Sequence, residues 1–475
     1  MNTNEQKALA IYNEGCEVAV QAISTLLTQV DVLERKVAQL SKNSSNSSKP
    51  PSSDITKPKP KKRGKGKRKI GAQHGHPKHE RPPFPEDEIK KIHEYCLNVC
   101  PECDNPDVTF IDKPPRIIQQ MELEKVVVFK EEHRSYPVWC ERCEKIHYHS
   151  FPENVVKEGL FKERITALVA YMKGVAHASY STIRKFIRDV LGEKVSRGYL
   201  RKIMMKVSHA LDAPYGELLD RLPFEPYLNV DETGHKENGE KFWTWVFRAD
   251  LYVLFKIDKS RGSKVLIDVL GKEFDGVLGC DYFSAYRKYM NDFNIIVQFC
   301  IAHLIRDIKY LTGLSDAATK SYGERLLTAV KDMFKVIHDK ENLATEDFNQ
   351  AMQRARKNIM ETALKDVPSR LNKKGKEQNR EALNMSNRFR KNGEAYFQFI
   401  TTPEIGPTNN LAEQAVRFVV IDRRITQGTR SENGRETNER LWTVVGTCAL
   451  QGRSAFEFIF QAVHAYFYNQ PAPSL

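Results

Sequence analysis

The amino-acid sequence predicts a multidomain α/β protein whose sheet-containing domain lies in the C-terminal half of the chain. Three observations lead to this prediction. The chain has 475 residues, too many for one hydrophobic core of ordinary size. After residue 221, short apolar segments with strand character alternate with amphipathic helical segments. Before that point the sequence divides into four segments of different character, which indicates several modules joined in series.

The overall composition is that of a globular protein, with 40% hydrophobic and 28% charged residues. A run of about 18 apolar residues is missing, so we expect no membrane span and no membrane partner. The N-terminus lacks a basic flank followed by an apolar core, which argues against a secretory signal. The expected location is therefore the cytoplasm.

The first module, residues 1–42, has the heptad pattern of a coiled coil. β-Branched residues at one heptad position and leucine at the other favour a parallel dimer. The seam is formed by Ile23, Leu26, Val30, Leu33, Val37 and Leu40. An amphipathic helix that packs on its own chain is the alternative, and three heptads do not exclude it.

Residues 43–85 form a polar, strongly basic linker. Residues 43–82 carry 12 Lys and Arg against Asp54 and Glu80, so most of the chain's net charge of +13 lies here. The stretch from Lys57 to Lys69 has nine basic residues in thirteen. Such a segment cannot bury enough apolar surface to fold alone, and its charge favours a nucleic-acid partner. A linker that merely keeps the protein soluble is the alternative.

Residues 86–153 hold two CxxC knuckles, which predict a structural Zn²⁺ site. Four thiolates bind one Zn²⁺ tetrahedrally and leave no open position for catalysis. The predicted ligands are Cys100, Cys103, Cys140 and Cys143. Cys96 and His93 are substitutes if one of these fails, and four reduced structural cysteines are the alternative.

Residues 154–220 are predicted to be helical. Residues 179–207 read as a helix, a turn at Gly192 and a second helix with Ser196 at its N-cap. Arg197, Arg201 and Lys202 lie near the start of this second helix, where a recognition helix would meet DNA. An ordinary helical hairpin without DNA contacts is the alternative.

The last module, residues 221–475, has the element order of an RNase H-like fold. We predict strands at 226–231, 241–247, 251–257, 276–281 and 295–300, with a helix at 263–271 between the third and fourth. Asn238-Gly239 predicts a tight hairpin between the first two strands. Charged residues about 316–395 are predicted to be a helical insertion that helps to grip DNA, and residues 441–467 to be buried helices.

Three acids in this domain are candidate ligands of catalytic metal ions. Asp231 and Asp281 end the first and fourth strands, which are neighbours in an RNase H-like sheet, and ligands gather at such strand ends. Glu413 falls in the first turns of a later helix that Thr408 or Asn409 could cap. Carboxylate oxygens favour Mg²⁺ or Mn²⁺, and two such ions can promote phosphodiester chemistry.

Other polar residues near these acids have weaker signals. Glu232, beside Asp231, is expected to support the site or to be exposed rather than to bind metal. His303 and Arg306 follow the fifth strand, either near the scissile phosphate or simply at a helix start.

Several motifs of the chain resemble those of insertion-sequence-66 transposases. They are SSNSSKPPSSD (44–54), DETG (231–234), CDYFSAY (280–286), CIAHLIRD (300–307) and PTNNLAEQAVR (407–417), in the family's order. The segment with the CxxC knuckles likewise resembles the family's zinc-binding region. The chain departs from the family at 421–436, where a polar stretch replaces an aromatic, apolar run. No role is therefore assigned to Arg423, Arg424 or Arg430.

This resemblance implies a bacterial, DNA-associated transposase that cleaves element ends and transfers strands. It matches Asp231, Asp281 and Glu413 to the family's DDE acids. It further implies DNA as the partner, a homodimer or higher oligomer, and accessory proteins from the same element. Two alternatives stay open: a metal-dependent nuclease without strand transfer, and a catalytically silent DNA-binding relic.

Overall fold

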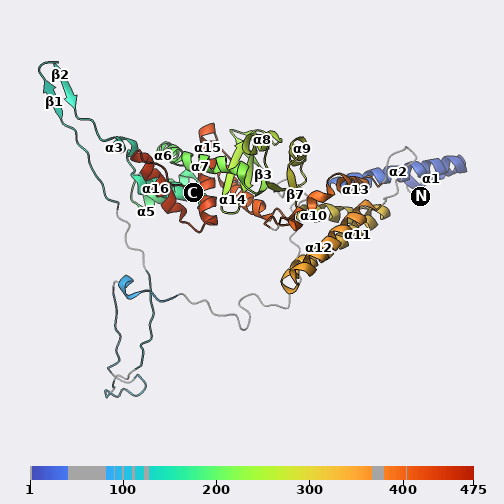
Figure 1. Cartoon of the computed structure of the whole chain (residues 1–475), viewed down its shortest axis with the longest axis horizontal. Helices are drawn as coiled ribbons and strands as arrows, with labels where there is room; N and C mark the ends of the chain where they lie inside the picture. Colours follow the sequence, from blue (N-terminus) through green and yellow to red (C-terminus); the bar gives the residue numbers. More distant parts are fainter. Residues whose placement is uncertain are drawn as a thin grey trace. The chain divides into compact units, whose positions relative to one another are not determined.

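The computed structural model describes residues 3–40, 82–89, 91–98, 101–107, 109, 113–121, 128–365, 379–402 and 404–475 (Figure 1). Contacts divide the chain into two compact units, residues 1–58 with 132–475 and residues 59–131. Each unit is described by itself. The basic stretch from Lys57 to Lys69 and the knuckle residue Cys100 lie outside the described residues, so the predictions made for them stay predictions.

Two helices lie at the N-terminus, α1 (Thr3–Asn13) and α2 (Cys16–Leu40). Gly15 separates them with a φ of +114°, which residues with a Cβ rarely adopt. Helix α2 contains the whole predicted heptad segment. Its seam residues from Ile23 to Val37 are between 48% and 64% exposed, so no described part of the chain covers the apolar stripe.

The segment before the helical region contains a β-hairpin. Strands β1 (Pro137–Cys140) and β2 (Lys145–Tyr148) pair antiparallel, and the second CxxC knuckle lies at the turn between them. In the unit of residues 59–131, the described part has one helical element, the 3-10 helix η2 (Glu86–Glu88). Cys96 and Cys103 are exposed in that unit.

The predicted helical region is present as five helices. Ser179 and Ser196 cap α5 and α6 by accepting a hydrogen bond from the backbone N–H three residues later, as expected for Ser196. Gly192 turns the chain between them with a φ of +75°. Buried side chains of α4 and α6 share a hydrophobic core with the two C-terminal helices. The five helices are α3 (Glu153–Glu158), α4 (Glu163–Gly174), α5 (Tyr180–Val190), α6 (Arg197–Ala210) and α7 (Asp212–Arg221).

A five-stranded mixed sheet forms the centre of the C-terminal half. Its strand order is β5-β4-β3-β6-β7, with β3, β6 and β7 parallel and β4 and β5 antiparallel to their neighbours. This order is consistent with the predicted RNase H-like core. The strands are β3 (Tyr227–Glu237), β4 (Glu240–Arg248), β5 (Val253–Asp258), β6 (Val277–Cys280) and β7 (Ile296–Phe299).

One strand boundary differs from the prediction. We expected the first strand to end at Asp231, but β3 continues to Glu237 because its second half forms a hairpin with β4. Asn238 and Gly239 make the turn, both with positive φ, as the sequence predicts. Only the first part of β3, Tyr227 to Asn229, pairs with β6, so Asp231 still lies just beyond the parallel pairing.

Helices cover the sheet and close its exposed edge. Helix α14 (Asn410–Thr426) contacts β3 and β4, and α15 (Glu432–Leu450) contacts β5. Side chains of α15 spaced four residues apart accept hydrogen bonds from the free N–H groups of the edge strand β5. Thr447 accepts from Val253 (3.3 Å), Thr443 from Phe255 (3.1 Å) and Glu439 from Ile257 (2.5 Å). These bonds satisfy backbone groups that an edge strand otherwise leaves open.

The remaining helices follow the strands or lie in the predicted insertion. Helices α8 (Lys264–Leu270) and α9 (Ser284–Phe293) connect strands, and α16 (Ala455–Phe467) packs on α4 and α6. Helices α10 (Ile301–Thr312), α11 (Ala317–His338), α12 (Thr345–Leu364) and α13 (Arg380–Asn392) contact one another in succession (Figure 1). In the described ranges, no helix has the length and apolar character needed to cross a bilayer.

Candidate active site

The register of the two central strands brings Asp231 and Asp281 together. Asn229 of β3 is paired with Gly279 of β6 in parallel register. Each aspartate lies two residues beyond its partner in that pair. Since side chains alternate between faces along a strand, both carboxylates leave the sheet at the same edge and on the same face. Asp231 and Asp281 are fifty residues apart in the sequence, and so are the paired residues Asn229 and Gly279.

The two aspartates occupy an electrostatically crowded position. Burial raises the pKa of Asp231 well above its usual range, and the charges of Glu232, Asp281 and Glu413 raise it further. Burial also raises the pKa of Asp281, while the nearby His303 and the N–H of Phe283 lower it. Each aspartate accepts one backbone N–H through Oδ1, from Glu232 and Phe283 respectively, both at 2.9 Å.

Asn409 anchors the start of α14, and with it Glu413, to the sheet. Its side chain donates to the carbonyl of Val230 (2.8 Å) and accepts from the amide of Asn229 (2.9 Å). Its backbone N–H donates to Cys300 Sγ at the end of β7 (3.1 Å). The predicted capping role is therefore wrong for the side chain, which makes no cap hydrogen bond and reaches across to β3 instead.

Glu413 lies in the first turn of α14 and pairs with two cationic or basic groups of α10. Its Oε1 lies 3.6 Å from His303 Nδ1 and 3.5 Å from Arg306 Nη2. Burial lowers the pKa of His303, with Arg306 adding to this effect. His303 and Arg306 thus orient the third acid. The three acids do not form a group whose ligand atoms all lie within 4.8 Å, whereas Cys300, His303 and Glu413 do.

Glu232 follows Asp231 in the sequence, and its side chain is bound by residues other than the three acids. It is buried, and its carboxylate accepts hydrogen bonds from Arg261 (2.7 Å) and the hydroxyl of Tyr286 (2.5 Å). Burial and the charge of Asp281 raise the pKa of Glu232 to about 7. Of the two expectations for this residue, exposure is contradicted by its burial, and support of the site stays a prediction. Arg261 follows β5, and no local motif in the sequence marked it.

Comparison with known proteins places these residues in a family. A profile described as "Transposase IS66 family" matches residues 158–437, more than half of the chain and a range that holds all three acids. The chain belongs to the IS66 transposase family. A second profile, for a family of unknown function, matches residues 4–82.

One curated relative is similar over much of the chain. The uncharacterized protein y4qI of Sinorhizobium fredii is 24% identical over 355 residues, which make up 68% of this chain. The match covers 63% of that relative, so the chain spans less than two thirds of its length. The resemblance to the transposase family predicted from the motifs is confirmed by the family match.

Three arginines in residues 421–436, where the chain departs from the family motif, have different environments. Arg423 is half-buried and donates to the hydroxyl of Thr233 (3.2 Å) and to the carbonyl of Gly234 on β3. Arg424 and Arg430 are exposed. Arg423 therefore stabilises the contact of α14 with β3, and only the other two are available to a ligand.

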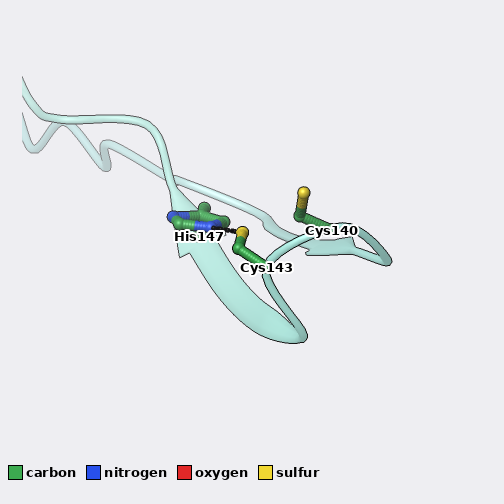
Figure 2. Close-up of side chains that lie close together, drawn as sticks. All are labelled: Cys140, Cys143 and His147. Carbon is green, nitrogen blue, oxygen red and sulfur yellow. Dashed lines mark hydrogen bonds between the residues drawn. The ribbon is translucent and has the colours of Figure 1, made fainter.

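A separate cluster of metal-binding residue types lies on the β1–β2 hairpin, before the family match. Ligand atoms of Cys140, Cys143 and His147 lie within 4.8 Å of one another, and Cys143 Sγ is 3.0 Å from His147 Nε2 (Figure 2). Hydrogen bonding from the backbone N–H of Cys143 lowers the pKa of the Cys140 thiol, which favours the thiolate. His147 was not predicted, although its place on the strand after the knuckle is a recognisable signal.

Proposed function

We propose that this IS66-family protein is an active DNA transposase that cleaves element ends and transfers the strands to target DNA. The proposal is supported above all by the parallel register that pairs Asp231 with Asp281 at one edge of the sheet. The anchoring of α14 through Asn409, which brings Glu413 to the same edge, is the second support.

The donor set fits the expected divalent cation, Mg²⁺ or Mn²⁺. Three carboxylates supply hard oxygen ligands, and Asp231 carries a raised pKa to which the other acids contribute. A divalent cation between Asp231, Asp281 and Glu413 would relieve this repulsion. When bound, such ions supply activation of a water or 3′-hydroxyl and stabilisation of the leaving oxygen of a phosphodiester.

The chain's own residues prepare this site. The backbone N–H groups of Glu232 and Phe283 orient the two aspartates, and no described residue donates a hydrogen bond to Oδ2 of either one. His303 and Arg306 hold the carboxylate of Glu413. Arg261 and Tyr286 hold the carboxylate of Glu232, the residue that follows Asp231, in a fixed position.

The test of this proposal uses DNA from both sides of the gene, labelled at the ends. Wild-type protein with Mg²⁺ should nick the DNA at the boundaries of terminal inverted repeats and join those ends to a plasmid. Asp231→Asn, Asp281→Asn and Glu413→Gln should each lose both reactions while retaining DNA binding, since phosphate contacts and not these acids supply affinity. Cleavage without joining favours the nuclease alternative. Binding without cleavage by the wild type favours the silent relic.

We further propose that the Cys140–Cys143 hairpin binds a structural Zn²⁺. The two cysteines and one histidine, and their proximity, support this assignment. Two ligand sets remain open. In the first, Cys100 and Cys103 join Cys140 and Cys143, as the sequence predicts. In the second, His147 binds the ion together with Cys140 and Cys143.

A homodimer through α2 is the remaining part of the proposal. The exposed seam from Ile23 to Val37 supports it, because apolar stripes of this length are usually covered by a partner helix. Light scattering on the full chain and on a chain starting at residue 45 should give a dimer and a smaller species. The cytoplasmic location and the accessory proteins stay predictions.

A further inference from the structure

A cavity of about 580 Å³ lies away from the acids, between the helical region and the far end of α14. One wall is formed by the first turns of α5 and α6. The other is formed by the end of α14 at Ile425 and Thr426, the segment that joins α14 to α15, and the first turns of α15. We refer to it as the α6–α15 groove.

The groove has the charge and polar groups of an anion site. Its lining contains four basic residues, hydroxyl and amide side chains, and no aspartate or glutamate. Lys173 is already paired with Asp422 (3.4 Å). Arg197, Arg201 and Arg430 are exposed, and no carboxylate of the described residues lies within the 4.0 Å of an ion pair from any of them. Three unneutralised guanidinium groups facing one cavity repel one another and favour an anionic ligand.

A buried amide in the groove points independently to a ligand. Asn438 is 8% exposed and lines the cavity, yet its side chain makes no hydrogen bond to a described residue. Its amide is not among the atoms sealed from solvent, so it faces the open space of the groove. Buried polar side chains are nearly always hydrogen-bonded, so the N–H groups of this amide are available to a ligand whose oxygen atoms accept hydrogen bonds.

The N-termini of α5, α6 and α15 around the groove also favour an anionic ligand. Ser179, Ser196 and Ser431 each cap one backbone N–H of α5, α6 and α15, which leaves other N–H groups of those first turns without a helical partner. Such helix starts carry partial positive charge and attract phosphate groups.

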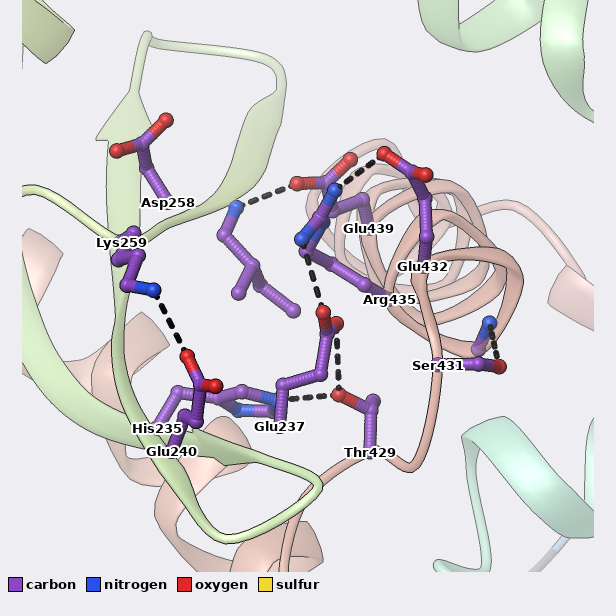
Figure 3. A network of polar contacts seen from close by, with 12 residues as sticks. His235, Glu237, Glu240, Asp258, Lys259, Thr429, Ser431, Glu432, Arg435 and Glu439 are labelled. Carbon is purple, nitrogen blue, oxygen red and sulfur yellow. Dashed lines mark hydrogen bonds and ion pairs between the residues drawn. The ribbon is translucent and has the colours of Figure 1, made fainter.

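The α15 wall is tied to the strand that carries Asp231. Thr429 exchanges backbone hydrogen bonds with β3 and its turn, to Lys236 and from Asn238, both at 2.9 Å. His235 and Arg435 add side-chain bonds to this connection, through Thr429 (3.1 Å) and Glu237 (3.1 Å) (Figure 3). A Cβ at Gly428 would lie 2.1 Å from the carbonyl oxygen of Lys236, so only glycine allows this close approach. The groove is thus held in a fixed position relative to the catalytic sheet.

Helix α14 connects the acids to the groove with a stripe of exposed basic residues. Glu413 is in its first turn and Ile425, twelve residues later, lines the groove, a rise of about 18 Å. Arg417 and Arg424 are exposed, lie two turns apart on one side of α14, and have no ion-pair partner among the described residues. A DNA strand places one phosphate about every 3.4 Å along the helix axis, so 18 Å corresponds to about five nucleotides.

We propose that the α6–α15 groove binds the phosphate backbone of DNA about five nucleotides from the bond held at the acids, with α14 as the track between the two positions. This inference rests on the proposed function for the identity of the DNA. It assigns Arg197, Arg201 and Arg430 to phosphate contacts, which position DNA, and not to reading of bases.

The test removes one arginine from each wall. The double variant Arg201→Gln/Arg430→Gln is compared with Lys264→Gln/Lys272→Gln, two exposed lysines outside the groove that change the net charge equally. The probe is a fluorescein-labelled 40-base-pair duplex of arbitrary sequence, bound by full-length protein in EDTA across a salt series. Each lost phosphate contact lowers the slope of log affinity against log salt by about 0.9, so the groove variant should lose about 2 in slope and bind about 60-fold more weakly at 0.1 M salt. The control should keep the wild-type slope.

A second measurement locates the contact. Neutral methylphosphonate linkages are placed singly along a cleavable duplex, and the position about five nucleotides from the cleaved bond should weaken wild-type binding but not binding by the groove variant. An unchanged slope in the groove variant, or equal losses in both variants, overturns the proposal. Because binding is measured without metal, this failure is distinct from failure of the transposase proposal, which would appear as wild-type protein that binds DNA and does not cleave it.

Discussion

Replacement of Asn409 by alanine tests how the third acid is brought to the sheet. The side chain is 1% exposed and joins α14 to β3 through two neutral hydrogen bonds. Alanine leaves the carbonyl of Val230 and the amide of Asn229 buried without a partner, and each such group costs about 1–3 kcal/mol. We expect a loss of about 3 kcal/mol in the free energy of unfolding. For a domain of this size that loss lowers the melting temperature by about 6–12 °C.

The assay is thermal unfolding of wild type, Asn409→Ala and Asn410→Ala. Asn410 is exposed on the same turn, so its replacement should change stability by less than about 0.5 kcal/mol. Below its melting temperature, Asn409→Ala should also cleave DNA about 100-fold more slowly, because a shift of about 1 Å at Glu413 is enough to disturb the site. Melting of both variants within about 1 °C of wild type would refute the anchoring role of Asn409.

Three further predictions concern single groups. Burial lowers the pKa of His235 to about 4, below the 6.5 of an unfolded chain; the neutral ring therefore stabilises the fold fully above pH 6.5, and up to about 3 kcal/mol should be lost as the pH falls toward 4. Thermal unfolding between pH 7.5 and 4.5 should show a smaller loss in His235→Gln than in wild type. Glu232→Ala leaves Arg261 and Tyr286 without their shared partner and should destabilise by about 2 kcal/mol, whereas Glu232→Gln, which keeps both contacts, should cost less; equal melting temperatures would argue against that role. Purified protein should contain one Zn²⁺ per chain, which Cys143→Ser removes; loss in His147→Ala but not Cys103→Ser would identify the hairpin group as the site, and the reverse would identify the four-cysteine site.

The pairing of Asp231 with Asp281 could be predicted from the sequence because strand order determines it. Five short apolar segments and one helix specify which strands are neighbours, and each aspartate lies just beyond the parallel pairing of β3 with β6. The end of the first strand could not be predicted correctly. Residues 232–237 continue the strand only because β4 pairs with them, and this pairing depends on the hairpin as a whole.

The side chains that support the acids were harder to predict, because their contacts are distant in sequence. Arg261 reaches Glu232 and Arg306 reaches Glu413 across 29 and 107 positions respectively. Asn409 has the residue type and position of a helix cap, so the sequence offers it, beside Thr408, as a capping candidate. Its actual partners, 180 and 179 positions away, become visible only when α14 is placed against the sheet.

The environments of the basic residues likewise depend on contacts that are distant in sequence. No sequence pattern distinguishes Arg423 from Arg424 and Arg430. In the structure, however, Arg423 is hydrogen-bonded to β3 and the other two are exposed. In the sequence, Arg197 and Arg201 lie where a recognition helix would meet DNA, but an ordinary helical hairpin without DNA contacts stays open as the alternative. In the structure they face a groove whose other wall comes from residues more than 200 positions later, which no local pattern in the sequence can indicate.

The central claim is that Asp231, Asp281 and Glu413 form one cation site, and melting temperatures with and without Mn²⁺ test it most directly. The variants are Asp231→Asn and Glu413→Gln; without metal, Asp231→Asn should melt at or above the wild-type temperature, because it removes a charge from a repelling group. Mn²⁺ at 100 times its dissociation constant should stabilise the wild type by about 2.7 kcal/mol. Neither variant should gain this stabilisation, while the exposed control Glu432→Gln should gain it in full. Equal stabilisation of wild type and Glu413→Gln by Mn²⁺ would contradict the account, since the third ligand would then lie elsewhere.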